Sequence, residues 1–171
     1  MKCKNYISAP ALMVFLAFVL SACLDDDIKP LEPGAKAPPF TLALLDGGSA
    51  NMESPHGNGH IVTFMASWCP CSNESIPFMK DAFERYKNKD VKFLMISIQD
   101  VQSKFEKFVK KWEVPFPAGF DDGGKIARIY GVKQPPTTVF IDRNGMVKRF
   151  FYGNIKDKES EFPKWLEELL S

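Results

Sequence analysis

IVTFMASWCPCS, residues 61–72, is the stretch of sequence that decides how this chain folds. Its first half is a run of β-branched and bulky apolar residues, which is typical of a buried strand. Its second half carries two thiols, Cys69 and Cys71, and apolar residues then recur at helical spacing as far as Tyr86. A thiol at a helix N-terminus meets unpaired N–H groups and the positive end of the helix dipole, which favour the thiolate. The stretch therefore predicts a redox or soft-metal site where a strand ends and a helix begins.

The rest of the chain alternates between strand-like and helix-like patterns. Asn144-Gly145 is a strong signal for a tight hairpin, and the segment ended by Asp46-Gly47-Gly48 is expected to form one arm of another. Apolar runs predict strands at 40–45, 61–65, 91–98, 137–141 and 146–151. Apolar residues at helical spacing predict further helices at 101–112, 125–130 and 162–170. This order predicts an α/β fold with a central mixed sheet, helices on both faces of the sheet and an extra N-terminal hairpin.

The first 22 residues have the character of a secretory signal. Lys2 and Lys4 precede an unbroken apolar run at 11–20, which is too short for a bilayer span of about 20 residues but suits a signal-peptide core. Leu20-Ser21-Ala22-Cys23 resembles the lipobox of bacterial lipoproteins, where cleavage precedes a cysteine that is then acylated. We therefore expect a leader at 1–22 and a lipid on Cys23; the alternative is an ordinary secreted protein with a chance cysteine.

Residues 23–36 are expected to be a tether, because prolines and the acidic run Asp25-Asp26-Asp27 leave little to bury. The globular domain is then expected at 37–171. Acidic residues just after a lipidated cysteine resemble sorting signals for the outer membrane or cell surface of some bacteria, although a solvated spacer is equally consistent with them. We expect a domain in the cell envelope, outside the cytoplasm, with the outer membrane or surface favoured over the inner membrane.

Composition restricts the function further. If Cys3 leaves with the leader and Cys23 carries lipid, Cys69 and Cys71 are the two remaining thiols, so no pair is left over for a structural disulfide. The net charge is +1 and basic residues are scattered, which gives no argument for nucleic acid. The sequence carries no Gly-rich dinucleotide motif or other cofactor signature, so we expect electrons to come from a partner.

Three segments together resemble the TlpA/ResA-like group of membrane-tethered thiol–disulfide oxidoreductases. They are similar to the opening segment of that group, to its active-site strand and helix, and to its late loop before a hairpin; they cover 37–42, 64–77 and 131–145. The resemblance extends over about residues 36–170 and implies a thioredoxin-like fold. It also implies protein thiols or disulfides as substrates, and a membrane thiol transporter or a thioredoxin-like partner as electron donor.

The resemblance also implies a set of site residues. Cys69 matches the nucleophile, and the Pro135–Pro136 bond is expected to be cis, as in the late loop of the family. That loop would lie beside the thiol and present backbone groups to a peptide substrate. The expected substrate-binding residues are Trp68, Pro70, Pro135, Pro136 and Thr137.

This chain departs from the family at the second cysteine, because it has Cys69-Pro70-Cys71 in place of Cys-x-x-Cys. With Pro77 aligned to the helix proline of the family, Ser72 occupies the resolving-cysteine position and Cys71 lies one residue earlier. Side chains two apart on a helix point to nearly opposite sides, so a Cys69–Cys71 disulfide would require a distorted first turn.

A second departure concerns proton transfer. Thr63 occupies a position where some thioredoxin-fold proteins bury a carboxylate, and Ser75 occupies the position of the usual glutamate. Neither hydroxyl is a good general base, which counts against efficient turnover as a reductase.

Four functions remain open at this stage. The favoured one is thiol–disulfide exchange, in which Cys69 attacks and either Cys71 or an external thiol resolves the mixed disulfide. The second is a Cu(I)-transfer module built on the two soft thiolates, although neither His56 nor His60 lies in the late loop where related copper chaperones have their histidine. The third is a non-catalytic scaffold. A peroxiredoxin is weaker, because Ala66 replaces the hydroxyl residue expected three positions before the peroxidatic cysteine.

Overall fold

The computed structural model describes residues 28–52 and 57–171. The expected leader, the expected lipidation site Cys23 and the histidine at position 56 lie outside the described residues, so nothing in the structure bears on them.

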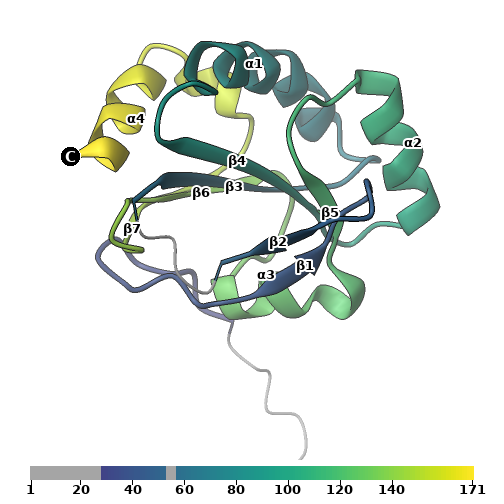
Figure 1. Ribbon diagram of the computed structural model, residues 1–171. Helices are drawn as coiled ribbons and strands as arrows, with labels where there is room; N and C mark the ends of the chain where they lie inside the picture. The colour runs from purple at the N-terminus through teal and green to yellow at the C-terminus, as the bar shows by residue number, and fades with distance from the viewer. Residues whose placement is uncertain (1–27, 53–56) are drawn as a thin grey trace, which may run out of the picture.

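A five-stranded mixed sheet forms the centre of the domain, in the order β5-β4-β3-β6-β7 (Figure 1). The two parallel neighbours pair β3 with β4 and β4 with β5, whereas β6 runs antiparallel to both β3 and β7. The strands are β3 (Gly59–Met65), β4 (Val91–Ser97), β5 (Ala118–Phe120), β6 (Thr137–Ile141) and β7 (Val147–Tyr152). The expected mixed sheet is confirmed.

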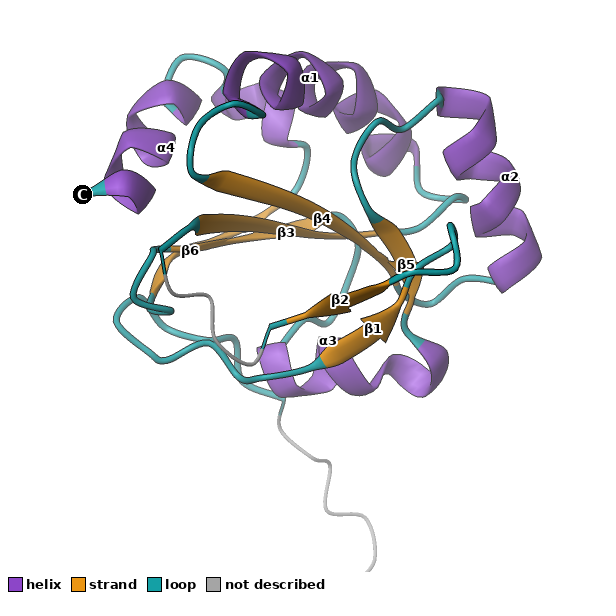
Figure 2. Ribbon diagram, viewed as in Figure 1, coloured by secondary structure: helices purple, strands orange, loops and turns teal. Residues whose placement is uncertain are grey.

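Helices cover both faces of the sheet, as Figures 1 and 2 show. One face carries α1 (Pro70–Tyr86), α2 (Gln102–Trp112) and α4 (Phe162–Leu170), and the other carries α3 (Lys125–Tyr130) with the hairpin of β1 (Thr41–Ala43) and β2 (Ser49–Asn51). Successive side chains of a strand point to opposite faces. Accordingly, Ile61 and Met65 join the core under α1 and α4, whereas Val62 and Phe64 join the core above α3. The thioredoxin-like arrangement with an extra hairpin is thus the observed fold.

The sequence patterns did not predict β5, a short strand whose Gly119 lies against the first hairpin. This three-residue strand lies between Pro117 and Asp121 and is too short to show an alternating pattern. The first hairpin crosses it at the Leu44–Gly119 bridge, and a Cβ on Gly119 would lie 2.6 Å from the carbonyl oxygen of Ala43. Only glycine allows the two backbones to approach so closely.

The turn between β6 and β7 is longer than Asn144-Gly145 alone. The hairpin itself is confirmed, but a register shift beside Ile141 leaves five residues between the strands. The Asp142 carboxylate accepts hydrogen bonds from the backbone N–H groups of Asn144 and Met146, both at 2.9 Å. This side chain organises a wider loop than a two-residue turn.

The packed chain begins before the expected domain boundary at Ala37. In the preceding segment, the N–H of Gly34 donates to the carbonyl of Val147 at 2.7 Å, and the N–H of Val147 donates to the carbonyl of Ala35 at 2.8 Å. Leu31 packs against the core on the α3 side of the sheet. Residues 28–36, expected to be tether, therefore lie against the domain. Two 3-10 turns, Asp122–Gly124 and Ile155–Lys158, complete the described elements.

Candidate active site

Cys69 lies at the junction between β3 and α1, where the sequence predicts it. A turn closed by the Cys69 N–H and the Ala66 carbonyl at 3.1 Å leads the chain out of β3. Cys69 is then the N-cap residue of the 17-residue helix α1, with Pro70 at the first helical position. Proline is well suited there because its fixed φ matches the helix and its missing N–H would have had no partner. The thiol therefore sits at the positive end of the α1 dipole, and only 8% of the residue is exposed.

The loop before β6 lies directly beside this thiol. The Cys69 thiol donates to the carbonyl oxygen of Pro135 at 3.7 Å, although the two residues are 66 positions apart. The Pro135–Pro136 peptide bond is cis, as expected. The loop and the thiol are therefore in contact, as the family resemblance implied.

Two of the residues expected to bind substrate lie beneath the surface. Pro136 is buried, and Thr137 is fully buried with its hydroxyl donating to the Gln134 carbonyl at 2.7 Å. Pro136 and Thr137 therefore support the loop at 134–137 from its buried side. Pro135 is partly exposed and Pro70 is exposed, so these two can meet a substrate directly.

Cys71 and Ser72 have opposite environments. Cys71 is exposed, whereas Ser72 is fully buried and its hydroxyl accepts a hydrogen bond from the Ala66 N–H at 3.3 Å. Both cysteines are free thiols. The inward-facing position three residues after Cys69 is therefore filled by a hydroxyl, and the second thiol faces solvent.

Trp68, next to Cys69 in the chain, forms an exposed rim of the site. It is 58% exposed, and its indole N–H donates to the Gln99 carbonyl at 2.7 Å. Val101, which follows shortly after Gln99, and Tyr152, which pairs with Thr137 in the β6–β7 ladder, are also exposed. Trp68, Val101 and Tyr152 are thus exposed apolar side chains close in sequence or strand pairing to the segments that meet at the thiol.

Sequence reasoning missed two residues that hold the turn before Cys69. The Asp100 carboxylate accepts hydrogen bonds from the Ser67 N–H at 2.5 Å and from the Ser67 hydroxyl at 3.0 Å. The Asn73 amide donates to the carbonyls of Ser67 at 3.1 Å and Cys69 at 2.9 Å. Asp100 follows β4, and carboxyl ends of parallel neighbours share one edge of a sheet, so its position after a parallel strand was the available signal.

Thr63 and Ser75, the two residues expected to be poor bases, are both buried in the structure. Thr63 is buried, and its hydroxyl oxygen lies 3.4 Å from that of Thr138 on β6. Ser75 is also buried, with its hydroxyl 2.9 Å from the amide oxygen of Asn154. The Thr63 hydroxyl pairs with that of Thr138, and the Ser75 hydroxyl contacts the Cys71 carbonyl and the Asn154 amide, so neither neutral hydroxyl supplies a base to Cys69.

His60 cannot assist Cys69, because it lies at the opposite end of β3. Burial lowers the pKa of this histidine from its ordinary value of 6.5, and the nearby Lys92 lowers it further, against a backbone hydrogen bond with Asn58. Within residues 28–52 and 57–171, no group of three or more His, Cys, Asp or Glu residues is placed to hold a metal ion. A Cu(I) site in this part of the chain would depend on the two thiols.

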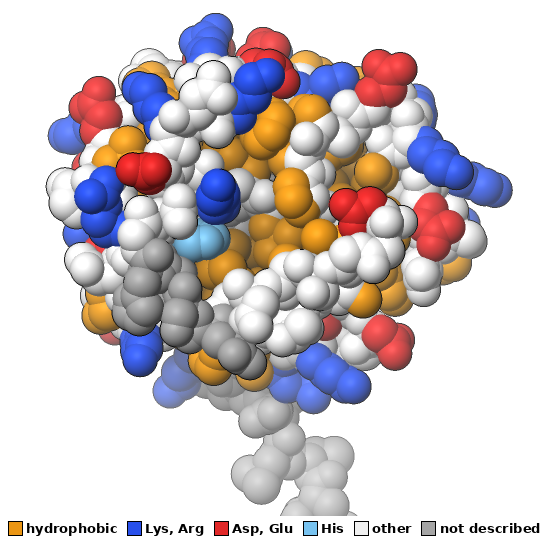
Figure 3. Space-filling view, in the orientation of Figure 1, with side chains coloured by type: hydrophobic (Ala, Val, Ile, Leu, Met, Phe, Trp, Pro, Cys, Tyr) orange, Lys and Arg blue, Asp and Glu red, His pale blue; other side chains and the backbone are white. Residues whose placement is uncertain are grey.

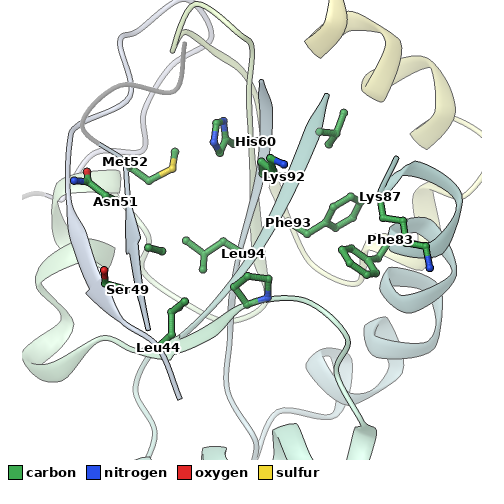
Figure 4. Close-up of a pocket in the computed structure, with 13 residues that line it drawn as sticks. Leu44, Ser49, Asn51, Met52, His60, Phe83, Lys87, Lys92, Phe93 and Leu94 are labelled. Atoms are coloured by element: carbon green, nitrogen blue, oxygen red, sulfur yellow. The ribbon is translucent and has the colours of Figure 1, made fainter. Parts of the chain in front are cut away.

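A cavity of about 430 Å³ opens beside the first residues of β4, far from the thiols. Figure 3 shows it as an apolar hollow with a histidine at its margin, and Figure 4 shows His60, Lys92, Leu94 and Met52 around it. It exists because β5 pairs with only Met95–Ser97 of β4. The cavity contains none of the predicted site residues.

A family model and several curated proteins match most of the chain. The model of the AhpC/TSA family matches residues 33–150. The chain is 32% identical over 136 residues to the thiol-disulfide oxidoreductase ResA of Bacillus thuringiensis subsp. konkukian, covering 78% of each protein. It is 28% identical over 149 residues to the ResA protein of Geobacillus thermodenitrificans, covering 86% of this chain and 85% of the relative.

Solved structures agree with this similarity. A Chlorobium tepidum protein named as a candidate thiol:disulfide interchange protein DsbE has a TM-score of 0.76 and 29% identity, over 82% of this chain and 99% of its own. A secreted disulfide oxidoreductase of Mycobacterium tuberculosis, homologous to DsbE of E. coli, has a TM-score of 0.65 and 25% identity, over 76% and 96%. In the described part of the chain, no helix is both long and apolar enough to cross a membrane.

Proposed function

Because the chain belongs to the AhpC/TSA family and is a ResA-like thiol–disulfide oxidoreductase, we propose that Cys69 is the nucleophile that attacks protein disulfides outside the cytoplasm. The observation that carries this proposal is the position of the Cys69 thiol, at the N-terminus of α1 and 3.7 Å from the Pro135 carbonyl of the cis-proline loop. The helix end favours the thiolate, and the loop offers backbone groups to a docking peptide.

The first step forms a mixed disulfide. The Cys69 thiol loses its proton, the thiolate attacks one sulfur of the substrate disulfide, and an S–S bond forms between them. The other substrate sulfur leaves as a thiolate and takes up a proton. One substrate disulfide is thereby opened while Cys69 is oxidised to the mixed disulfide.

The second step needs another thiol, and we propose that an external thiol supplies it, with Cys71 as the alternative. The external thiol attacks the substrate sulfur, regenerates the Cys69 thiolate and leaves a disulfide between itself and the substrate. The exposure of Cys71 and the complete burial of Ser72 support this choice, because the inward position next to Cys69 carries no sulfur. If Cys71 resolves instead, a Cys69–Cys71 disulfide forms and the substrate leaves fully reduced.

The proposal includes a place in the cell envelope. The lipobox-like sequence at 20–23 supports a lipid anchor on Cys23, and the secreted relative of known structure supports a domain outside the cytoplasm. The acidic run after Cys23 favours the outer membrane or surface. The electron donor would then be a membrane thiol transporter or a thioredoxin-like partner in the same compartment.

The test compares Cys69→Ser and Cys71→Ser with the wild type on a disulfide-bonded peptide, in the presence of excess external thiol. We expect Cys69→Ser to lose turnover and Cys71→Ser to retain most of it. Wild-type turnover in Cys69→Ser contradicts the proposal. A loss in Cys71→Ser as large as that in Cys69→Ser assigns the second step to Cys71.

The same proteins should be assayed for peroxide consumption, because residues 69–73 of this chain resemble the Cys-Pro-x-Ser-Asn segment of some redoxin-like proteins. We expect none that depends on Cys69. Ala66, fully buried at the position where a peroxidatic site would carry a hydroxyl, offers no side-chain donor to a peroxide.

A further inference from the structure

Gln99 joins the two loops that flank Cys69. Its backbone carbonyl accepts the indole N–H of Trp68 at 2.7 Å, and its side-chain amide donates to the carbonyl of Lys133 at 2.7 Å. Lys133 lies in the loop that ends at the cis Pro135–Pro136 bond. One residue therefore contacts Trp68 through its main chain and the cis-proline loop through its side chain.

The backbone of Gln99 has a conformation that side-chain-bearing residues rarely adopt. Its φ is +52°, in the left-handed region, and it lies in the bend that follows β4. Such a conformation is unfavourable for a residue with a Cβ and persists only where surrounding contacts hold it. The two hydrogen bonds described above are such contacts. Although glycine would suit the turn better, the chain has a glutamine there, whose long amide reaches across to the opposite loop.

We propose that Gln99 is a positioning residue that fixes the spacing between Trp68 and the cis-proline loop, and thereby favours extended peptide disulfides over small disulfides. This inference rests on the proposed function of Cys69. A small disulfide needs access to the sulfur alone, whereas a peptide must contact Trp68 and the loop at Pro135 at the same time. Holding both loops in place before the substrate arrives reduces the conformational entropy that is lost when a peptide docks. The affinity for a peptide therefore rises, whereas that for a small disulfide does not.

The variant that isolates this role is Gln99→Glu. The carboxylate has the same shape as the amide but has no N–H, so it cannot donate to the Lys133 carbonyl. Gln102→Glu is the matched control, because Gln102 is also an exposed glutamine and its side-chain amide donates to Glu106 on its own helix. It introduces the same charge close to the site without touching either loop.

Both variants are assayed with a disulfide-bonded peptide and with the small disulfide 5,5′-dithiobis(2-nitrobenzoate). For Gln99→Glu we expect KM for the peptide to rise about fivefold, the factor that corresponds to losing one ordinary hydrogen bond. We expect kcat for the peptide and the rate with the small disulfide to match those of Gln102→Glu. Equal peptide KM values in Gln99→Glu and Gln102→Glu overturn the inference, as does an equal loss with both substrates.

A second measurement does not depend on activity. Hydrogen exchange of the Trp68 indole N–H, followed by NMR, should accelerate in Gln99→Glu because the loop that carries its acceptor is released on one side. Trp112 and Trp165 serve as internal controls. If the wild type shows no Cys69-dependent turnover with either disulfide, the proposed function fails. In that case, unchanged exchange at Trp68 in Gln99→Glu also overturns the positioning role. Faster exchange shows that Gln99 links the two loops but gives this link no role in catalysis.

Discussion

At the scale of single residues, the site is decided by which side of the first turn of α1 each thiol occupies. Residues three apart on a helix are neighbours, whereas residues two apart are not. Ser72, three positions after Cys69, is fully buried, and Cys71, two positions after, is exposed. The proposed nucleophile Cys69 therefore has no sulfur at the buried position three residues later, which is the physical reason for proposing an external resolving thiol.

The double variant Cys71→Ser/Ser72→Cys tests this reading by moving the sulfur one residue. We expect the new thiol at position 72 to form a disulfide with Cys69, because the two positions are helix neighbours and disulfide Cβ atoms need to approach about 3.8 Å. Thiol trapping in defined glutathione buffers should then show a single two-electron couple. Cys71→Ser alone is the control and should show none. If both thiols of the double variant stay open to alkylation under oxidising conditions, the assigned orientation of the turn is wrong.

At the scale of elements, hydrogen bonds from residues of other elements hold the turn between β3 and α1. Asp100, at the end of β4, accepts the Ser67 N–H and hydroxyl. Asn73 binds the carbonyls of Ser67 and Cys69 and accepts the indole N–H of Trp112 at 3.2 Å. The position of the thiol thus depends on β4 and α2 as well as on its own helix.

Asp100→Ala should reduce stability and loosen the turn. Removing the carboxylate leaves the partly buried Ser67 N–H without its partner, which costs about 1–3 kcal/mol of unfolding free energy. Urea denaturation followed by tryptophan fluorescence measures the loss. Asp122→Ala, at an exposed aspartate of the first 3-10 turn, is the control and should change stability by less than about 0.5 kcal/mol. Equal midpoints for the two variants would show that Asp100 does not support the turn.

At the scale of the whole molecule, the segment before Ala37 is part of the packed domain. It lies on the side of the molecule opposite α1 (Figure 1) and contacts β7 and α3 through backbone hydrogen bonds. A Cβ on Gly131, at the end of α3, would lie 2.0 Å from the Lys29 carbonyl oxygen, so a residue with a side chain would displace this segment.

A chain that begins at Ala37 should therefore be less stable than one that begins at Ile28. Three backbone hydrogen bonds are lost, made by the N–H groups of Leu31, Gly34 and Val147, together with the packing of Leu31. At about 1 kcal/mol for each bond, the expected loss in unfolding free energy is about 2–4 kcal/mol. Chemical denaturation compares the two, with a chain that begins at Leu24 as control. Identical stability of all three would place the start of the domain at Ala37.

Most strands and helices of this protein were predictable from its sequence, because local periodicity carries that information, whereas the three-residue strand β5 was too short to show a period. A continuous run of apolar residues, or apolar residues at every second position, predicts a strand, as at Ile61–Met65. Apolar residues with a period of 3.6 predict a helix, as at Lys125–Tyr130. The site at the β3–α1 junction followed from the same local signals and from the position of Cys69. The cis bond before Pro136 followed from a family resemblance.

Only the tertiary structure decided what surrounds that thiol. Pro135, Asp100 and Gln99 make hydrogen-bonded contacts with residues 67–69 from 31 to 66 positions away. The family resemblance indicated the Pro135 loop and the end of a parallel strand was a signal for Asp100, but no local pattern marks Gln99 or the contacts themselves. The three residues meet at one edge because β3, β4 and β6 are neighbours in the sheet. A sequence specifies which faces are apolar, whereas the packing of those faces against each other sets which polar groups end up side by side.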